Sequence, residues 1–552
     1  MGKSQKAAQL LVDCLERHGV EYIFGIPGAK IDAVFDALLG SPIKVILCRH
    51  EQNAAFMAAA YGRLTGKPGV VLVTSGPGVS NLATGLLTAT TEGDPVIALG
   101  GAVPRNTKLR DTHQNVDNLR LMEAVTKIGM EVIMAENIPE IVENAFRIAS
   151  KPRCGAVFVS LPQDVLMEMT DAEANEPIPV SEWSVAPDAL LERAAQLINE
   201  AQLPVLLLGL EASRPENSVA VRRLLEKTPL ATVGTYQAAG TVSRKLIDCF
   251  IGRVGLFKNQ PGDTLLDAAD VVITVGYDGI EYEPGVWNPG KKKKILHIDY
   301  HRANIHTAYL PSLEVTGDIA ANLLALMPKL HKRAKVFDLP LVNERQRQLT
   351  ERFESGTHFS GPLMHPLRFI HDLRKTLDDD ATVISDIGSH YIWLAHYFSS
   401  FQPRHLVFSN GQQTLGVALP WAMATTLARP GTKVVSISGD GGFLFSAMEL
   451  ETAVREKMNL VHFVWCDGAY NMVLEQQILK YKRESAVRFG YVDIVKFAES
   501  FGAKGFKVND SDEFIPILTN ALNLEGPVIV EVPIDYSDNP ELYKAKIENI
   551  GH

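Results

Sequence analysis

Residues 435–442 read Val435-Ser436-Ile437-Ser438-Gly439-Asp440-Gly441-Gly442, an apolar run that passes directly into a glycine-rich loop. A helical pattern follows, with Ser446 and Glu449 at the spacing of a capping box. The same layout occurs early in the chain, as Val71-Leu72-Val73-Thr74-Ser75-Gly76-Pro77-Gly78. Strand, tight loop and helix form the repeating unit of parallel sheets that are covered by helices. The two stretches therefore predict two outer domains of related layout.

The remaining sequence continues this alternation of short β-branched runs and helix-length segments. The predicted strands are Lys44–Leu47, Val70–Thr74, Val96–Leu99, Ala156–Ser160, Pro204–Leu208, Val271–Val275, Ile295–Ile298, Thr382–Ser385, Leu406–Phe408, Lys433–Ser438, Leu460–Trp465 and Val528–Val532. A polar, proline-dotted segment at 167–187 and a highly charged segment at 329–362 are typical of linkers. We therefore predict an α/β fold with three doubly wound parallel-sheet domains, at residues 1–170, 188–330 and 362–552.

Composition excludes several classes of function. With 46% hydrophobic and 21% charged residues, the 552-residue chain is typical of a soluble globular protein. A formal charge of -10 argues against nucleic-acid binding, and the basic block Lys291–Lys294 is better explained as a solvated strand entry than as a phosphate site. No run of eighteen apolar residues and no signal-peptide pattern occurs, so we expect no membrane association. The five scattered cysteines indicate reduced thiols and a cytoplasmic location.

Asp440 is an acidic residue in a loop that is otherwise suited to phosphate. Glycines allow the backbone to approach a phosphate closely, and the following helix offers free N–H groups. A carboxylate would repel that phosphate unless a cation bridged the two. Asp467 ends the next predicted strand, 27 positions later, so both carboxylates can reach the same edge of the sheet. Mg²⁺ binds one or two carboxylates together with phosphate oxygens, although a simple strand–helix turn remains an alternative.

The segment from Gly439-Asp440-Gly441 to Cys466-Asp467 resembles the signature of thiamine-diphosphate enzymes, which usually ends in two asparagines instead. The resemblance implies thiamine diphosphate and Mg²⁺ as cofactors. It implies that the metal is held by Asp440, Asp467 and the main-chain carbonyl of Ala469. It also implies a set of residues around the cofactor: Gly388, Ser389, His390, Gly439, Gly441, Gly442, Tyr470, Asn471 and Met472.

Glu51 is the candidate for activating the cofactor, because thiamine chemistry needs one carboxyl group on the pyrimidine nitrogen. It follows a predicted strand and opens the apolar helix that begins Asn53-Ala54-Ala55. An acidic residue at a helix start can also simply compensate the helix dipole. Five segments, however, occur in the order and spacing of the pyruvate-type thiamine enzymes, and the resemblance extends from about residue 5 to 540. These segments are Phe24–Ala29, Arg49–Glu51, Ala58–Arg63, Ser75–Gly78 and Glu92–Pro95.

The segment Asn410-Gly411-Gln412-Gln413-Thr414-Leu415-Gly416 resembles the part of the family that bends the cofactor into a V. The resemblance places Leu415 under the bend, and the Gln413 carbonyl and Leu415 N–H at the pyrimidine, with Gly411 among the cofactor-binding residues. Core packing of Leu415 remains the alternative. In this family the first domain of one subunit and the third domain of another share each site. A homodimer or homotetramer with active sites at the subunit interface is therefore implied.

Within this family the sequence is most similar to acetolactate synthases of the catabolic, FAD-independent kind. These condense two pyruvates to 2-acetolactate with release of CO₂, for acetoin and butanediol formation. The segments that carry this similarity are 410–414, Trp465–Val473 and Asp535–Pro540. FAD-dependent relatives have a segment resembling RFDDR where this chain reads Gly276-Tyr277-Asp278-Gly279-Ile280-Glu281-Tyr282-Glu283-Pro284, so FAD is not expected.

Four residues are the candidates for the reaction itself: Glu51, Gln114, Gln476 and Lys30. The resemblance implies that Gln114 faces the intermediate and that Lys30 is a candidate for the carboxylate of the acceptor pyruvate. Gln476 stands where biosynthetic relatives have a tryptophan that favours 2-ketobutyrate, although it can equally lie on a solvated helix face. The alternative functions are a pyruvate oxidase or decarboxylase of the same family, or a non-catalytic paralogue that binds nucleotides through its middle domain.

Overall fold

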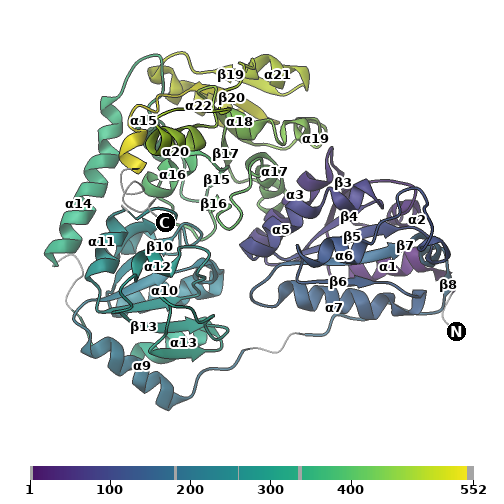
Figure 1. The fold of residues 1–552 in the computed structure, drawn as a ribbon, viewed down its shortest axis with the longest axis horizontal. Helices are drawn as coiled ribbons and strands as arrows, with labels where there is room; N and C mark the ends of the chain where they lie inside the picture. Colours follow the sequence, from purple (N-terminus) through teal and green to yellow (C-terminus); the bar gives the residue numbers. More distant parts are fainter. Residues whose placement is uncertain (1–3, 180–182, 259, 334–338, 544–552) are drawn as a thin grey trace.

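Three parallel six-stranded sheets form the framework of the protein (Figure 1). The structure, a computed structural model, describes residues 4–179, 183–258, 260–333 and 339–543. Within each of the three sheets all neighbouring strands run parallel, and helices lie between successive strands. The predicted α/β class with three doubly wound domains is therefore confirmed. None of the described helices combines the length and the apolar content that crossing a bilayer requires.

The first domain has the strand order β3-β2-β4-β5-β7-β6. Its strands are β2 (Tyr22–Ile26), β3 (Lys44–Leu47), β4 (Gly69–Val73), β5 (Val96–Ala102), β6 (Ile128–Glu131) and β7 (Ala156–Pro162). Its helices are α1 (Ala7–Arg17), α2 (Asp32–Leu38), α3 (Glu51–Thr65), α4 (Pro77–Ser80), α5 (Ala83–Glu92), α6 (Asn118–Glu123), α7 (Ile138–Ser150) and α8 (Gln163–Leu166). A short antiparallel pair, β1 (Gln5–Lys6) with β8 (Met169–Thr170), joins the start of this domain to its end.

The third domain has the order β16-β15-β17-β18-β20-β19, which is the same relative order as in the first domain. Its strands are β15 (Thr382–Ser385), β16 (Leu406–Phe408), β17 (Val434–Gly439), β18 (Val461–Cys466), β19 (Lys504–Lys507) and β20 (Val528–Pro533). Its helices are α15 (Pro366–Thr376), α16 (Ser389–Tyr397), α17 (Ala418–Ala428), α18 (Asp440–Phe443), α19 (Leu450–Arg455), α20 (Asn471–Tyr481), α21 (Ile494–Ser500) and α22 (Phe514–Asn523). The chain reverses direction across the sheet between β15 and β17, as it does between β2 and β4.

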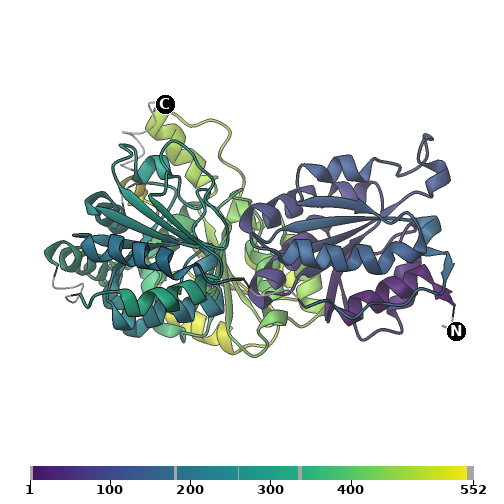
Figure 2. The same cartoon turned by 90° about the horizontal axis from the view of Figure 1, so that it is seen from below.

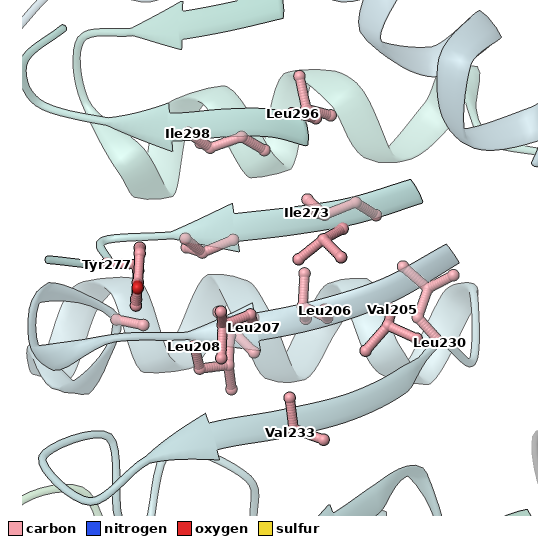
Figure 3. Packing of buried hydrophobic residues seen from close by; sticks show 14 of the residues in the cluster. Val205, Leu206, Leu207, Leu208, Leu230, Val233, Ile273, Tyr277, Leu296 and Ile298 are labelled. Carbon is pink, nitrogen blue, oxygen red and sulfur yellow. The ribbon is translucent and has the colours of Figure 1, made fainter. Parts of the chain in front are cut away.

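The central domain differs, because its order β11-β10-β9-β12-β13-β14 is that of a dinucleotide-binding sheet. Its strands are β9 (Pro204–Leu208), β10 (Ala231–Thr235), β11 (Phe250–Val254), β12 (Val271–Val275), β13 (Lys294–Asp299) and β14 (Leu313–Thr316). Its helices are α9 (Asp188–Glu200), α10 (Pro215–Lys227), α11 (Pro261–Ala268), α12 (Pro284–Trp287) and α13 (Ile319–Leu326). Figure 3 shows its core, where Leu206, Ile273 and Leu296 are paired in register and fully buried. Strands covered on both faces are nearly all apolar, which is why the sequence revealed them.

Several elements differ from the sequence expectations. The charged linker contains a helix, α14 (Pro340–Glu354), which runs along the outside of the molecule between the central and third domains (Figure 1). Only Val342 of this helix is buried, so it has no apolar stripe to reveal it. Six strands of the three parallel sheets were also missed, and five of them contain a glycine: β2, β6, β10, β11 and β19. In β2 the glycine serves close packing, since a Cβ on Gly25 would lie 2.0 Å from the Leu72 carbonyl oxygen.

The predicted helix after the glycine-rich loop is broken rather than continuous. After α18 comes a 3-10 turn, η8 (Ala447–Glu449), and then α19. The predicted capping box of Ser446 and Glu449 is wrong, because Ser446 makes no side-chain cap there. The Glu449 carboxylate instead accepts hydrogen bonds from the first domain. A long-range contact of this kind cannot be read from local spacing.

The first and third domains meet along helices α3 and α17 (Figures 1 and 2). Both helices are buried and rich in alanine, as in Ala54, Ala55 and Ala58 of α3. Small side chains allow the two helix backbones to approach closely and exclude water from the domain boundary. Each of the two outer sheets thereby keeps a fixed position relative to the other within one chain.

Candidate active site

The carboxyl ends of β15, β17 and β18 surround a cavity of about 310 Å³. In doubly wound sheets ligands bind at this edge, where the strand order reverses. Fourteen predicted site residues lie in the cavity wall: Gly388, Ser389, His390, Gln413, Leu415, Gly439, Gly441, Gly442, Asp467, Ala469, Tyr470, Asn471, Met472 and Gln476. The wall also includes four residues that the sequence did not suggest: Ile387, Trp465, Val473 and Tyr536.

The two predicted metal-binding carboxylates lie on neighbouring loops of this edge. Asp440 accepts hydrogen bonds from Gly441 N (2.9 Å) and Gly468 N (2.9 Å), so it joins the loops after β17 and β18. Burial raises the pKa of Asp440. Burial, together with the nearby Asp440 carboxylate, raises the pKa of Asp467 to about 6, although the Asn471 amide opposes this shift. Two carboxylates that are each costly to ionise form a set that a divalent cation would stabilise.

The donor set fits magnesium better than a metal held by side chains alone. Over the described ranges, no group of three or more histidine, cysteine, aspartate or glutamate side chains is placed to hold a metal. A cation between Asp440 and Asp467 would therefore take its remaining ligands from the main chain, water or phosphate oxygens, as Mg²⁺ commonly does. Ala469 lies two residues after Asp467, and its main chain is held by an antiparallel β-bridge to Arg488.

Two helix N-termini face the same cavity and suit an anionic group. Ser389 begins α16 and Asn471 begins α20, and the Ser389 hydroxyl donates to the Asn471 side-chain oxygen at 2.6 Å. The free N–H groups of a helix start favour phosphate. His390 is buried, and burial lowers its pKa to about 3, so its ring is neutral. Among the described residues its Nε2 atom has no hydrogen-bond partner, which leaves one polar atom for a ligand.

The segment that carries Gln413 and Leu415 is held from all three domains. Gly416 N donates to both carboxylate oxygens of Asp386 at 3.0 Å. From the first domain, Glu92 accepts hydrogen bonds from Asn410 N and Gly411 N at 2.6 Å each. From the central domain, the Glu281 carbonyl accepts from the Asn410 amide at 3.1 Å. Gly411 itself is not part of the cavity wall. It packs against the other two domains, since a Cβ there would meet Thr91 at 3.2 Å and Ile280 at 3.3 Å.

The candidates from the first domain gather at the carboxyl edge of its own sheet. Glu51 begins α3 and accepts a hydrogen bond from Asn81 at 2.9 Å. Gln114 has a φ of +59° and accepts a hydrogen bond from Ser75 at 3.2 Å. Lys30 is half-buried, and its Cβ lies 3.1 Å from where a Cβ on Gly101 would be. None of these three residues belongs to the wall of the cavity in the third domain as the described part of one chain forms it.

The central-domain segment that replaces the flavin motif is partly packed into protein, and its residues 277–280 also line a cavity of about 660 Å³. The Tyr277 ring is buried, and its hydroxyl accepts a hydrogen bond from Trp287 Nε1 at 3.2 Å. Asp278 pairs with Arg153 of the first domain. The buried Glu281 carboxylate accepts hydrogen bonds from Leu210 N and Thr235 Oγ1, and burial raises its pKa to about 8. The segment itself therefore contributes acidic groups, while the guanidinium groups beside it, Arg153 and Arg302, come from other segments.

Comparison with known proteins finds relatives that match this chain over nearly its full length. An acetolactate synthase from Bacillus subtilis is 53% identical over 546 residues, covering 98% of this chain and 95% of the relative. A catabolic acetolactate synthase from Raoultella terrigena is 47% identical and covers 97% of this chain and 96% of its own. The large subunit of acetolactate synthase isozyme 2 from Escherichia coli is 31% identical, with 96% of both chains covered.

Family models agree with the division into three sheets. Models of the N-terminal TPP binding domain, the central domain and the C-terminal TPP binding domain of thiamine pyrophosphate enzymes match residues 5–121, 191–326 and 386–532. With the three parallel sheets and the cavity, these matches define a three-domain thiamine pyrophosphate enzyme. The similarity over nearly the whole chain narrows this class further: the chain belongs to the acetolactate synthase family.

Proposed function

We propose that this enzyme condenses two molecules of pyruvate to 2-acetolactate with release of CO₂, in the direction of acetoin and butanediol. The observation that carries the proposal is the cavity at the carboxyl edge of the third sheet, which gathers Asp467, Asn471 and Gln476 in one wall. The catabolic relative, similar over nearly its full length, supports the metabolic direction. A cytoplasmic location is part of the proposal, since the five thiols are free and would be kept reduced there.

The residues of the cavity suit thiamine diphosphate with Mg²⁺. Asp440, Asp467 and the Ala469 carbonyl would hold the metal, and the starts of α16 and α20 would hold the diphosphate. When bound, the cofactor supplies the electron sink that decarboxylation and carbon–carbon bond formation require. Leu415 would lie against the bend between the two rings of the cofactor, on a segment that Asp386 and Glu92 fix from behind. The chain's own contribution is to orient the reactants and to exclude water.

Glu51 is proposed to hydrogen-bond the pyrimidine nitrogen and so to promote removal of the thiazolium proton. Because Glu51 does not line the cavity within one chain, the proposal requires that a second copy supply it. Exposed apolar side chains next to the cavity support such an interface. Phe445 is 45% exposed, Val473 46% and Tyr470 38%. A homodimer or homotetramer with shared sites would bury these side chains, and would bring Lys30 and Gln114 of the partner towards pyruvate.

We propose that FAD is not required. The support is the buried Tyr277 ring and the acidic residues Asp278 and Glu281, which stand at the carboxyl end of β12 in place of the segment resembling RFDDR in FAD-dependent relatives. A flavin-dependent pyruvate oxidase is the main rival within the same class. Flavin absorbance in the purified protein would favour that rival.

One product assay tests the proposal directly. The purified protein is stripped of metal and cofactor, then supplied with pyruvate, thiamine diphosphate and Mg²⁺. We expect one CO₂ and one 2-acetolactate for every two pyruvates consumed. Formation of acetaldehyde or acetyl phosphate in place of acetolactate would contradict it.

A further inference from the structure

Glu449 is a fully buried carboxylate that reaches from the third domain into the first. It ends the 3-10 turn η8, six residues after Phe443 ends the short helix α18, and its side chain crosses the domain boundary. Its Oε1 atom accepts hydrogen bonds from Arg49 N at 2.8 Å and His50 N at 3.0 Å. The Asn53 amide donates to the same oxygen at 3.2 Å. These donors lie on both sides of Glu51.

The second oxygen of Glu449 is fixed as well. Its Oε2 atom accepts a hydrogen bond from Thr452 Oγ1 at 2.8 Å, and that hydroxyl lies 3.1 Å from the carbonyl oxygen of Leu47, the last residue of β3. The Thr452 hydroxyl shares one proton between these two acceptors, so the main contacts of Glu449 with the connection between β3 and α3 are the Arg49 and His50 N–H groups. Neither carboxylate oxygen is free to rotate away.

All of these hydrogen-bond partners of Glu449 are neutral N–H, amide or hydroxyl groups. Burial raises its pKa, which expresses the cost of removing a carboxylate from water without a cation beside it. The main-chain N–H groups of Arg49 and His50 offset part of that cost, since hydrogen bonds to a charged acceptor are the stronger kind. A buried carboxylate used in this way defines a backbone position more narrowly than apolar packing would.

We infer that Glu449 is a positioning residue, which holds the Arg49–His50 turn so that the Glu51 carboxyl points where it can act on the cofactor. The inference rests on the role proposed for Glu51. Glu51 takes its main-chain position from this turn, because it is the first residue of α3 and follows His50 directly. A displacement of a catalytic group by about 1 Å can lower the rate by about a hundredfold.

The test compares Glu449→Ala and Glu449→Gln with the control Glu456→Gln. Glu456 also crosses the domain boundary, but it pairs with the Lys44 side chain at 2.7 Å, and over the described ranges no hydrogen bond or ion pair joins it to the turn before Glu51. In the cofactor-free protein, amide hydrogen exchange should show Arg49 and His50 exchanging at least about tenfold faster in Glu449→Ala. Glu456→Gln should leave both amides protected, and Glu449→Gln should be intermediate because it keeps one acceptor oxygen. Unchanged protection in Glu449→Ala would overturn the inference.

The second readout is the exchange rate of the thiazolium proton in protein loaded with thiamine diphosphate and Mg²⁺. We expect Glu449→Ala to slow it about ten- to a hundredfold, while the Kd for the cofactor changes by less than about twofold, the usual margin for independent sites. Glu449→Gln should recover part of the rate. Exchange at the wild-type rate, in a variant whose turn has opened, would also overturn the inference.

A double variant separates this inference from the proposed function. If Glu449 acts through Glu51, then Glu51→Gln combined with Glu449→Ala should exchange the thiazolium proton no more slowly than Glu51→Gln alone. Losses that multiply would show that Glu449 acts by another route. A wild-type rate in Glu51→Gln alone would instead remove the proposed role of Glu51, while the amide exchange of the turn would still report on Glu449.

Discussion

Gln476→Trp tests whether the wall of the cavity sets the choice of acceptor. Gln476 lies on α20, one turn after Val473, and both residues belong to the cavity wall. The glutamine presents a polar amide where a tryptophan would present a flat apolar surface. 2-Ketobutyrate differs from pyruvate by one methylene group, so the substitution should favour 2-ketobutyrate as the acceptor.

The magnitude follows from the burial of that methylene. Removing one methylene from water is worth about 0.8 kcal/mol, which corresponds to about a fourfold change in relative rate. Well-shaped pockets discriminate by about 10- to 200-fold between substrates that differ by one methylene. The cavity of about 310 Å³ must also hold the cofactor, so the larger ring leaves less room for a perfect fit. We therefore expect a rise of at least about fourfold, at the lower end of this range.

The assay is a competition between pyruvate and 2-ketobutyrate, with acetolactate and acetohydroxybutyrate measured together. The wild type should make acetolactate predominantly. Lys480→Trp is the matched control, because Lys480 lies one turn further along the same helix and outside the cavity wall. A product ratio that stays the same in folded, active Gln476→Trp, or that rises equally in Lys480→Trp, would refute the reasoning and favour a solvated helix face for Gln476.

Three further predictions concern the cofactor and the buried carboxylates. Glu51→Gln should leave thiamine diphosphate binding intact and slow exchange of the thiazolium proton by about a hundredfold or more; exchange at the wild-type rate would contradict its role. Protein stripped with a chelator should recover full activity with Mg²⁺ and thiamine diphosphate, and a need for added FAD would show that the central domain has been misinterpreted. Burial raises the pKa of Asp386 to about 7, so its contribution to the stability of the cofactor-free protein should fall as pH rises from about 4 to about 7. The unfolding temperature of Asp386→Asn relative to wild type should therefore increase over that interval, and a constant difference would argue against the shift.

Much of the fold could be predicted because parallel strands buried on both faces are nearly continuous apolar runs. Runs such as Val271–Val275 and Val434–Gly439 carry this signal without any context. Strands such as β2 did not, because Gly25 interrupts the run to allow contact with the Leu72 carbonyl. Helix α14 was missed for the opposite reason, since its faces are mostly polar and its register is supported by surface pairs such as Arg347 with Glu351.

Some residues of the candidate site could likewise be predicted from local sequence, whereas others depend on contacts between distant parts of the chain. Residues that follow strand ends, such as Asp440 and Asp467, could be placed from spacing alone, because parallel strands bring their carboxyl ends to one edge. Trp465 and Tyr536 of the cavity wall were not predicted as site residues, although both lie within segments that carried the family resemblance. A buried aromatic residue at a strand end has the same local pattern whether it packs in a core or lines a cavity.

The contacts that hold the site in place could not be predicted from the sequence. In each of them, a carboxylate of one domain accepts main-chain N–H groups of the other. Glu92 of the first domain accepts the Asn410 and Gly411 N–H groups of the third, while Glu449 of the third accepts the Arg49 and His50 N–H groups of the first. Each carboxylate is buried and accepts two main-chain N–H groups across the boundary, in addition to side-chain donors such as Ser409 for Glu92 and Asn53 for Glu449. In the proposed homo-oligomer, a shared cofactor would need both halves of the site to be set by the fold of each chain before association, because binding energy is lost when loops must be ordered on association. Two carboxylates that cross the same boundary in opposite directions meet this need, since neither segment can shift without breaking hydrogen bonds to a buried charge.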